Sequence, residues 1–150
     1  MMNAASAVHT PEPIAASDAT RPTVFNILAG EATAVHHSST GTVGVLFSGQ
    51  GIEAEWVSKQ KEERDSEWFS QGSVDLILVL QGQLCVEFED ASLGDRVLKR
   101  GDLLVLPPMT RCRAYHWPEE SDQETIFFAT YPKAERDPGL FTLHRWCTTA

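Results

Sequence analysis

The sequence lacks long apolar runs and has little positive charge. No stretch reaches the roughly 18 consecutive apolar residues that a membrane-spanning helix requires. Its 12 Lys and Arg residues stand against 21 Asp and Glu residues, so the formal net charge is −9 at pH 7. This charge repels phosphate backbones and anionic lipids, so we expect neither nucleic acid nor a membrane as a partner. Residues 1–10 also lack the cationic and apolar segments of a secretory signal.

Cysteine is scarce and widely spaced. Cys85, Cys112 and Cys147 form no pair separated by two residues, and their number is odd. A disulfide framework or a cysteine-rich zinc site would need closer and more numerous cysteines. We therefore expect a cytoplasmic protein whose thiols stay reduced.

The composition and length are typical of one globular domain. Apolar residues make up 42% and charged residues 22% of the 150 residues. Residues 1–22 are rich in Ala, Ser, Thr and Pro without a periodic apolar pattern, which predicts a disordered tail or an arm that orders against a partner. Residues 23–150 are predicted to form a single domain.

The apolar pattern after residue 23 is that of short strands. Amphipathic helices are lacking, and turn residues recur between the apolar segments, which indicates an all-β barrel or sandwich. The predicted strands cover residues 24–28, 42–47, 52–56, 76–80, 84–88, 103–106, 111–117 and 125–131, with a last strand or short helix at 140–146. The charged run at residues 59–65 is predicted to be an exposed loop or turn.

Alternation along residues 75–80 separates two faces of one strand. Asp75 shares a face with the side chains at 77 and 79, whereas Leu76, Leu78 and Leu80 share the other face. A row of three leucines needs a cover. We expect this cover to be either the N-terminal strands or a second copy of the chain in a homodimer. The adjacent His36 and His37 would point in opposite directions on a strand, so we interpret them as part of a polar loop.

Residues 75–132 resemble the conserved core of the cupin superfamily. Asp75 is followed after six residues by Gly82, as in the first cupin motif, with Asp in place of the usual Glu. Gly101 is followed after five residues by Pro107, as in the second motif. The resemblance implies a cupin-like double-stranded β-helix, a jelly-roll barrel with a site inside it.

The positions where cupins usually hold a metal depart from the family pattern. The resemblance implies imidazole ligands at positions that here carry Trp68, Ser70 and Cys112, while Met109 replaces a glycine and His116 an asparagine. We therefore expect no resident metal and no other cofactor. An unusual ligand set of Asp75, Cys112 and His116 is the alternative. Cys112 and His116 would lie about 13 Å apart along an extended strand, which disfavours that set.

The residues leave three functions open. A carboxylate inside an apolar barrel has its pKa raised by desolvation, which makes Asp75 the candidate acid or base for an isomerisation, cyclisation or elimination of a small organic ligand. The alternatives are a metal-dependent dioxygenase or isomerase, and a non-catalytic ligand sensor or interaction module. The predicted ligand-binding residues are Trp56, Trp68, Ser70, Cys112, His116, Phe128 and Tyr131.

Overall fold

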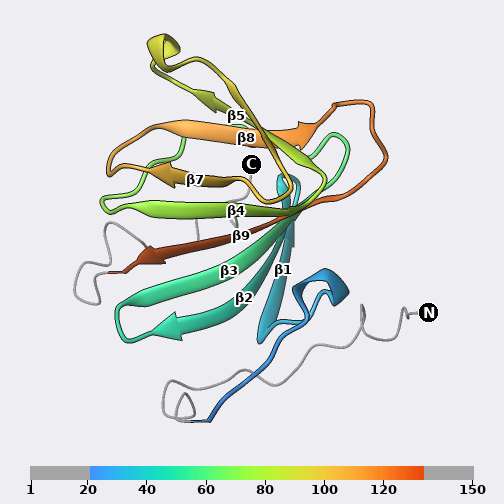
Figure 1. The fold of residues 1–150 in the computed structure, drawn as a ribbon, viewed down its shortest axis with the longest axis vertical. Helices are drawn as coiled ribbons and strands as arrows, with labels where there is room; N and C mark the ends of the chain where they lie inside the picture. Colours follow the sequence, from blue (N-terminus) through green and yellow to red (C-terminus); the bar gives the residue numbers. More distant parts are fainter. Residues whose placement is uncertain (1–20, 134–150) are drawn as a thin grey trace.

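The computed structural model describes residues 21–133 as two antiparallel sheets (Figure 1). The larger sheet contains, in spatial order, β1 (Ala34–Ser38), β2 (Gly41–Gly49), β3 (Ile52–Lys59), β9 (Thr125–Pro132), β4 (Asp75–Gln81) and β7 (Leu103–Leu106). The smaller sheet contains β6 (Arg96–Lys99), β5 (Gln83–Phe88) and β8 (Cys112–Trp117). The predicted all-β architecture is confirmed. Residues 1–20 of the tail predicted at 1–22, and the predicted element at 140–146, lie outside the described residues.

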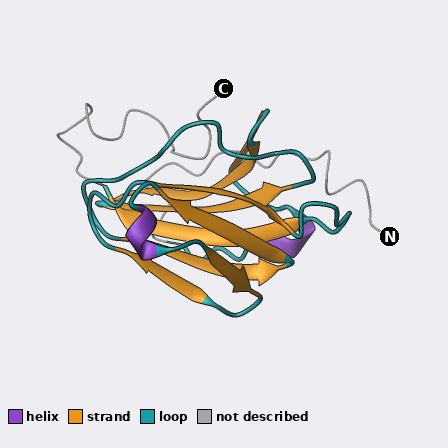
Figure 2. Cartoon of the chain, turned by 90° about the horizontal axis from the view of Figure 1, so that it is seen from above, coloured by secondary structure: helices purple, strands orange, loops and turns teal. Residues whose placement is uncertain are grey.

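Helix within residues 21–133 is limited to two single turns, η2 (Ile27–Ala29) and η3 (Ala91–Leu93), as the view from above shows (Figure 2). The prediction of a strand at residues 24–28 was wrong. The Asn26 side chain accepts a hydrogen bond from the Ala29 amide at 3.2 Å, and Gly30 ends the turn in the left-handed conformation, with φ of 79°. An Asx cap followed by a left-handed glycine favours a helical turn over a strand. No helix in the described part of the chain is long and apolar enough to cross a membrane.

The N-terminal histidines lie on a strand that the sequence pattern did not indicate. His36 and His37 belong to β1, where they pair with Val43 and Thr42 of β2, so the loop prediction was wrong. Both imidazoles are exposed, so the sequence shows no apolar alternation here. The strand forms because its backbone pairs with β2 in a hairpin. The short strand β6 was missed as well, because only one of its four residues is buried.

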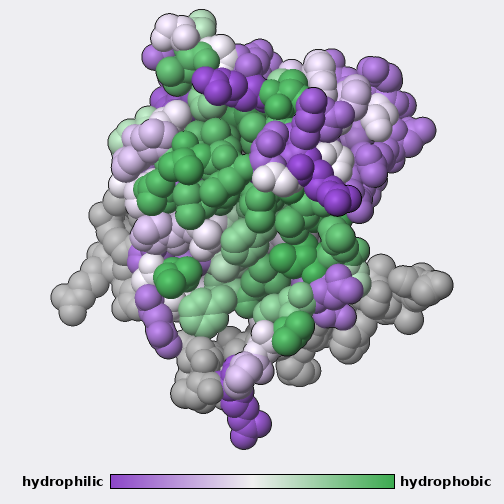
Figure 3. All heavy atoms as spheres, in the orientation of Figure 1, coloured by the Kyte–Doolittle hydropathy of each residue, from purple (hydrophilic) through white to green (hydrophobic). Residues whose placement is uncertain are grey.

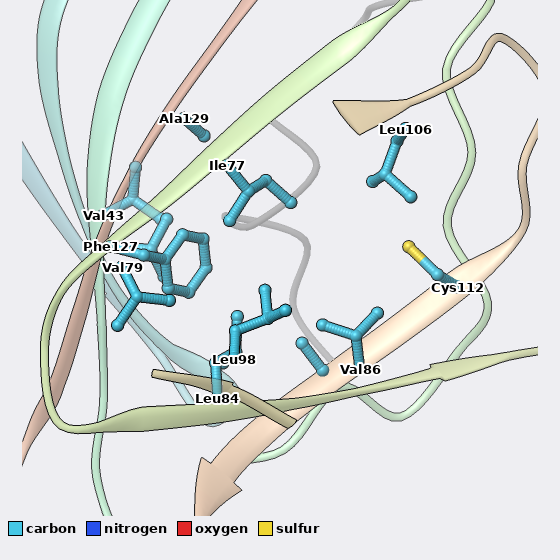
Figure 4. Packing of buried hydrophobic residues seen from close by; sticks show 12 residues of the cluster. Val43, Ile77, Val79, Leu84, Val86, Leu98, Leu106, Cys112, Phe127 and Ala129 are labelled. Atoms are coloured by element: carbon cyan, nitrogen blue, oxygen red, sulfur yellow. The ribbon is translucent and has the colours of Figure 1, made fainter. Parts of the chain in front are cut away.

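Apolar side chains from both sheets meet in one core (Figure 4). Ile77 and Val79 of β4 point toward Leu84 and Val86 of β5, which confirms the predicted inward face of residues 75–79. The buried cluster consists of Val43, Val57, Ile77, Val79, Leu84, Val86, Leu98, Leu106, Cys112, Ala114, Phe127 and Ala129. Each fully buried aliphatic or aromatic side chain contributes about 1.5–3 kcal/mol, so this cluster is the main source of stability.

The opposite face of the larger sheet carries an apolar surface. We define the outer β4–β7 face as Leu76, Leu78, Leu103 and Val105; Leu103 and Val105 are 56% and 54% exposed. In the space-filling view, apolar surface lies over β7 and β4 and continues toward the middle of the molecule (Figure 3). Strands β1 to β3 belong to the same sheet as β4, so they extend it and do not cover the row of leucines. The predicted cover by the N-terminal strands was therefore wrong.

The charged run after β3 is only partly the exposed loop that was predicted. Lys59 ends β3 and its ammonium lies 2.8 Å from Asp65 Oδ1, with both side chains 1% exposed. Asp65 Oδ2 also accepts a hydrogen bond from the Ala114 amide of β8 at 2.8 Å. The residues between Lys59 and Asp65 are mostly exposed, so the pair fastens an otherwise solvated loop against the smaller sheet.

Candidate functional site

Four polar side chains gather on the inward face of the larger sheet, next to its apolar core. The side chains come from three adjacent strands, and their residues are at most 4% exposed: Glu53 and Glu55 of β3, Asp75 of β4 and Tyr131 of β9. Buried carboxylates are rare in proteins unless they are paired or functional. This group is therefore the first candidate for a functional site.

The strand register fixes how these side chains lie relative to one another. Glu53 pairs with Tyr131, and Leu76 pairs with Thr130, so Asp75 lies level with Tyr131 on its other side. Neighbouring strands are about 4.8 Å apart, which places the three side chains in one row across β3, β9 and β4.

Glu55 belongs to the adjacent row of the same face. It pairs with Ala129, which in turn pairs with Ile77. Both of these neighbours are fully buried members of the apolar core. The carboxylate of Glu55 therefore lies where the polar group meets the core.

Several polar contacts fix the position of Glu53. Its Oε1 accepts a hydrogen bond from Ser48 Oγ at 2.6 Å and lies 3.5 Å from the ammonium of Lys133. Its backbone carbonyl accepts a hydrogen bond from Thr130 Oγ1 at 2.8 Å. These contacts hold the Glu53 side chain in place at one end of the row.

The direction of the β3 side chains is the reverse of the prediction. Trp56 was expected inside the barrel, but it lies on the outer face of the sheet, where its indole covers the backbone of Gly44. The indole Nε1 donates a hydrogen bond to the Glu31 carbonyl at 2.8 Å. The indole belongs to a second apolar cluster, on this outer face. Because side chains alternate along a strand, Glu53 and Glu55 then point inward. Phe128, also predicted to bind the ligand, packs against the same outer cluster.

Cys112 and His116 share the inward face of β8, as predicted, but they lie near opposite ends of that strand. Cys112 pairs with Phe88 and belongs to the apolar core. His116 Nε2 lies 2.6 Å from the carbonyl oxygen of Ser121, and Nδ1 lies 3.4 Å from Thr125 Oγ1. Because a carbonyl only accepts, Nε2 is the donor in the contact with Ser121. This imidazole is engaged in fixing the loop after β8.

Trp68 also lies outside the barrel. The Arg113 guanidinium stacks over its indole, 4.2 Å from the ring centroid, on the outer face of the smaller sheet. Phe69, between the two positions expected to hold ligands, pairs with Cys112 through two backbone hydrogen bonds of 2.8 Å. Its side chain therefore shares the inward face with Cys112. Ser70 follows it and is half-buried.

The residues present do not fit the metal site that a cupin resemblance implies. Within residues 21–133, no group of three or more His, Cys, Asp or Glu side chains is arranged to hold a metal ion. Trp68 faces away from the barrel, and Cys112 is surrounded by apolar side chains. We derive no step through a metal for this chain.

The second cupin motif keeps its turn geometry despite its changed sequence. Met109, at the position of the motif's second glycine, has a φ of 65°, in the left-handed region that glycine adopts most easily. Its amide donates a hydrogen bond to the Gln71 carbonyl at 2.7 Å, which ties the turn to the segment before β4. The turn is therefore retained in the structure although the glycine is absent.

One polar pair lies on the far side of the smaller sheet. Cys85 and Tyr115 are cross-strand neighbours on β5 and β8, and the Arg64 guanidinium lies 3.9 Å from the Tyr115 ring centroid. Burial raises the pKa of the Cys85 thiol, while its hydrogen bond with Tyr115 opposes this shift. Burial and the hydrogen bond with Cys85 both raise the pKa of the Tyr115 phenol far above its usual value. Neither group reaches the inward carboxylates.

Comparison with known proteins supports the fold and leaves the chemistry open. No protein-family model and no curated protein matches the sequence. Among solved structures, a protein from Ralstonia eutropha JMP134 named a "putative mannose-6-phosphate isomerase" is 19% identical, with a TM-score of 0.60 over 75% of this chain and 100% of its own. A cupin-like protein from Thermotoga maritima is 18% identical, with a TM-score of 0.55 over 63% and 69% of the two chains.

A third similar structure is an RmlC-like cupin from Shewanella frigidimarina NCIMB 400. It is 16% identical, with a TM-score of 0.56 over 69% of this chain and 86% of its own. An RmlC-like cupin from Methanocaldococcus jannaschii, described as a double-stranded β-helix, is also similar. The chain therefore has the cupin fold, as its Asp75, Gly82, Gly101 and Pro107 framework indicated.

Proposed function

We propose that this protein binds a small organic molecule at the inward carboxylates and catalyses proton transfer on it. The observation that supports the proposal is the burial of Glu55 and Asp75 beside Tyr131, on neighbouring strands and next to the apolar core of the barrel. Two carboxyl groups in one water-poor site can divide the roles of acid and base. In an isomerisation, one carboxylate takes a proton from the hydroxyl-bearing carbon next to the carbonyl while the other carboxyl group protonates the carbonyl oxygen, which gives an enediol. The first proton then returns to the former carbonyl carbon as the neighbouring hydroxyl gives its proton to the second carboxylate, so no oxidant or reductant is needed.

The charge of the site favours one class of ligand. Glu53, Glu55 and Asp75 make the inward face acidic, with Lys133 as a nearby cation at 3.5 Å from Glu53. A phosphorylated sugar would add negative charge at close range in a medium of low dielectric constant, which is unfavourable. A neutral hydroxycarbonyl compound offers hydroxyl donors to the carboxylates instead. We therefore propose an unphosphorylated polyhydroxy carbonyl compound as the substrate class.

Deuterium exchange tests this reaction without knowledge of the final product. The protein is incubated in D₂O with mannose, fructose or mannose 6-phosphate, and loss of the proton next to the carbonyl is followed by proton NMR. We expect exchange with the neutral sugars and little with the phosphate ester. Asp75→Asn should lower the exchange rate by about 100-fold or more.

The same exchange assay provides a control variant and three results that would contradict the proposed reaction. Asp122→Asn removes a carboxylate that is 94% exposed, so it should leave the exchange rate unchanged. Full activity of Asp75→Asn would refute its role as acid or base. Saturable binding of a sugar without exchange would favour a non-catalytic sensor. Loss of exchange on adding a chelator, together with stoichiometric metal in the purified protein, would favour the metal-dependent alternative.

A further inference from the structure

A pocket lies on the outer face of the larger sheet, on the opposite side from the inward carboxylates. It has a volume of about 300 Å³ and lies between the sheet and the turn η2, which Figure 1 shows next to β1. This volume is at the lower end of the range for small-molecule sites. The lining residues are Ile27, Leu28, Ala29, Gly30, Val35, His37, Thr42, Trp56, Ser58, Gln60, Glu124 and Ile126.

The apolar part of this pocket is built around Trp56. A Cβ atom at Gly44 would lie 2.0 Å from the indole, so only glycine allows the ring to lie flat against β2. The hydrogen bond from Trp56 Nε1 to the Glu31 carbonyl fixes the segment that carries η2 above the sheet. Val35 and Ile126 complete the apolar surface on either side. The pocket therefore has a flat apolar wall fixed at two points.

The polar part lies in the next row of the same face. His37, Thr42, Ser58 and Ile126 are successive cross-strand partners on β1, β2, β3 and β9. His37 Nδ1 lies 3.0 Å from Thr42 Oγ1, and Ser58 Oγ donates a hydrogen bond to Glu124 Oε2.

Glu124 is the acidic residue among the lining side chains. A carboxylate has about four acceptor positions, so the bond from Ser58 leaves Glu124 able to accept from a ligand. The pocket thus combines an apolar wall with one negatively charged acceptor.

We propose that this pocket binds a small molecule with a flat apolar body and a primary ammonium group. The apolar body would contact Trp56 and Ile126, and the ammonium would donate to the Glu124 carboxylate. Aromatic faces also attract nearby cations, which adds to the preference for this charge. A carboxylate ligand of the same shape would meet Glu124 as a like charge. The class is therefore an arylalkylamine or a similar amphiphilic amine.

A pair of probes with the same ring and opposite charge tests this proposal. The full-length protein is titrated with 2-phenylethylamine and with phenylacetate, and the indole Nε1–H signal of Trp56 is followed by ¹H–¹⁵N NMR. Trp56→Phe assigns that signal. We expect saturable shifts with the amine at concentrations where phenylacetate gives none.

Two variants distinguish recognition of the ammonium charge from non-specific binding of the amine. Glu124→Gln keeps an acceptor for Ser58 and removes the charge, so it should weaken amine binding by about tenfold. Glu120→Gln changes an exposed carboxylate outside the pocket and should leave binding unchanged. Equal binding of both probes, equal binding to Glu124→Gln, or no shift of the Trp56 signal would overturn the proposal. Asp75→Asn should bind the amine normally, so failure here and failure of the proposed reaction are distinguishable.

Discussion

The buried ion pair between Lys59 and Asp65 offers a quantitative test of the fold. In Asp65→Asn, the shape of the side chain is kept and its charge is lost. The Lys59 ammonium, within 2.8 Å of Asp65 Oδ1, would then keep the Thr40 carbonyl as its acceptor in a site that is 1% exposed. The change also weakens the bond from the Ala114 amide to Asp65 Oδ2, which attaches this loop to β8.

The expected cost follows from burial. Two unit charges 2.8 Å apart attract by about 6 kcal/mol at an effective dielectric constant of about 20, and desolvation offsets part of this. Removing one partner of a buried pair typically costs about 3–5 kcal/mol, because the other charge stays buried. Since a domain of this size is stable by about 5–15 kcal/mol, Asp65→Asn should lose about a fifth or more of its stability.

Urea unfolding followed by tryptophan fluorescence measures this loss. With a slope of about 2 kcal/mol per molar, the midpoint of Asp65→Asn should fall by about 2 M. The matched control is Glu119→Gln, which removes one partner of the exposed Arg64–Glu119 pair and should cost less than about 1 kcal/mol. Combining Lys59→Met with Asp65→Asn should cost less than the two single losses added together. Equal small shifts for Asp65→Asn and Glu119→Gln would refute the buried pair.

Three further predictions follow from other parts of the structure. Gly44→Ala should destabilise the fold by about 1–3 kcal/mol in urea and change the Trp56 fluorescence, because its Cβ would lie 2.0 Å from the indole; unchanged stability would contradict this packing. Because the pKa of Tyr115 is raised in the folded state, stability should fall as the pH rises above about 10, where the unfolded chain releases the proton that the folded chain retains. Tyr115→Phe should show a smaller fall, and an identical fall would contradict the assignment. We also propose that the outer β4–β7 face pairs with a second copy, so the protein should sediment as a dimer and Val105→Lys as a monomer, whereas a monomeric native protein would count against it.

The sequence predicted the barrel because its strands obey simple alternation. Asp75, Ile77 and Val79 were correctly placed on one inward face, since one face of β4 lies on the core. The positions of Gly82, Gly101 and Pro107 indicated the cupin fold, although the chain is only 12–19% identical to the similar solved structures named above.

The inward side of β3 could not be predicted in the same way. Alternation separates Glu53 and Glu55 from Trp56, but it does not say which set faces the barrel. Both faces of β3 are covered, one by the core and one by the segment that carries η2, so hydrophobicity alone selected the wrong side. The available signal was Gly44, the cross-strand partner of Trp56, because a glycine opposite a tryptophan leaves space for the ring.

The buried pair was hidden for a related reason. Lys59 and Asp65 lie at the two ends of a charged run, and charged runs are usually solvated. Their burial depends on contacts with Thr40 and Ala114, which are far apart in the sequence. No local pattern carries that information.

The central claim, a ligand site at the inward carboxylates, is tested most directly at the apolar side chains next to these carboxylates. Ala129 lies between Glu55 and Ile77 in the strand register, and both apolar residues are fully buried. Their methyl signals can be followed by ¹H–¹³C NMR while mannose or fructose is added. Saturable shifts of both methyls in the native protein, with weaker binding in Glu55→Gln, are the predicted result. Shifts confined to surface residues, or none with any sugar, would contradict the account.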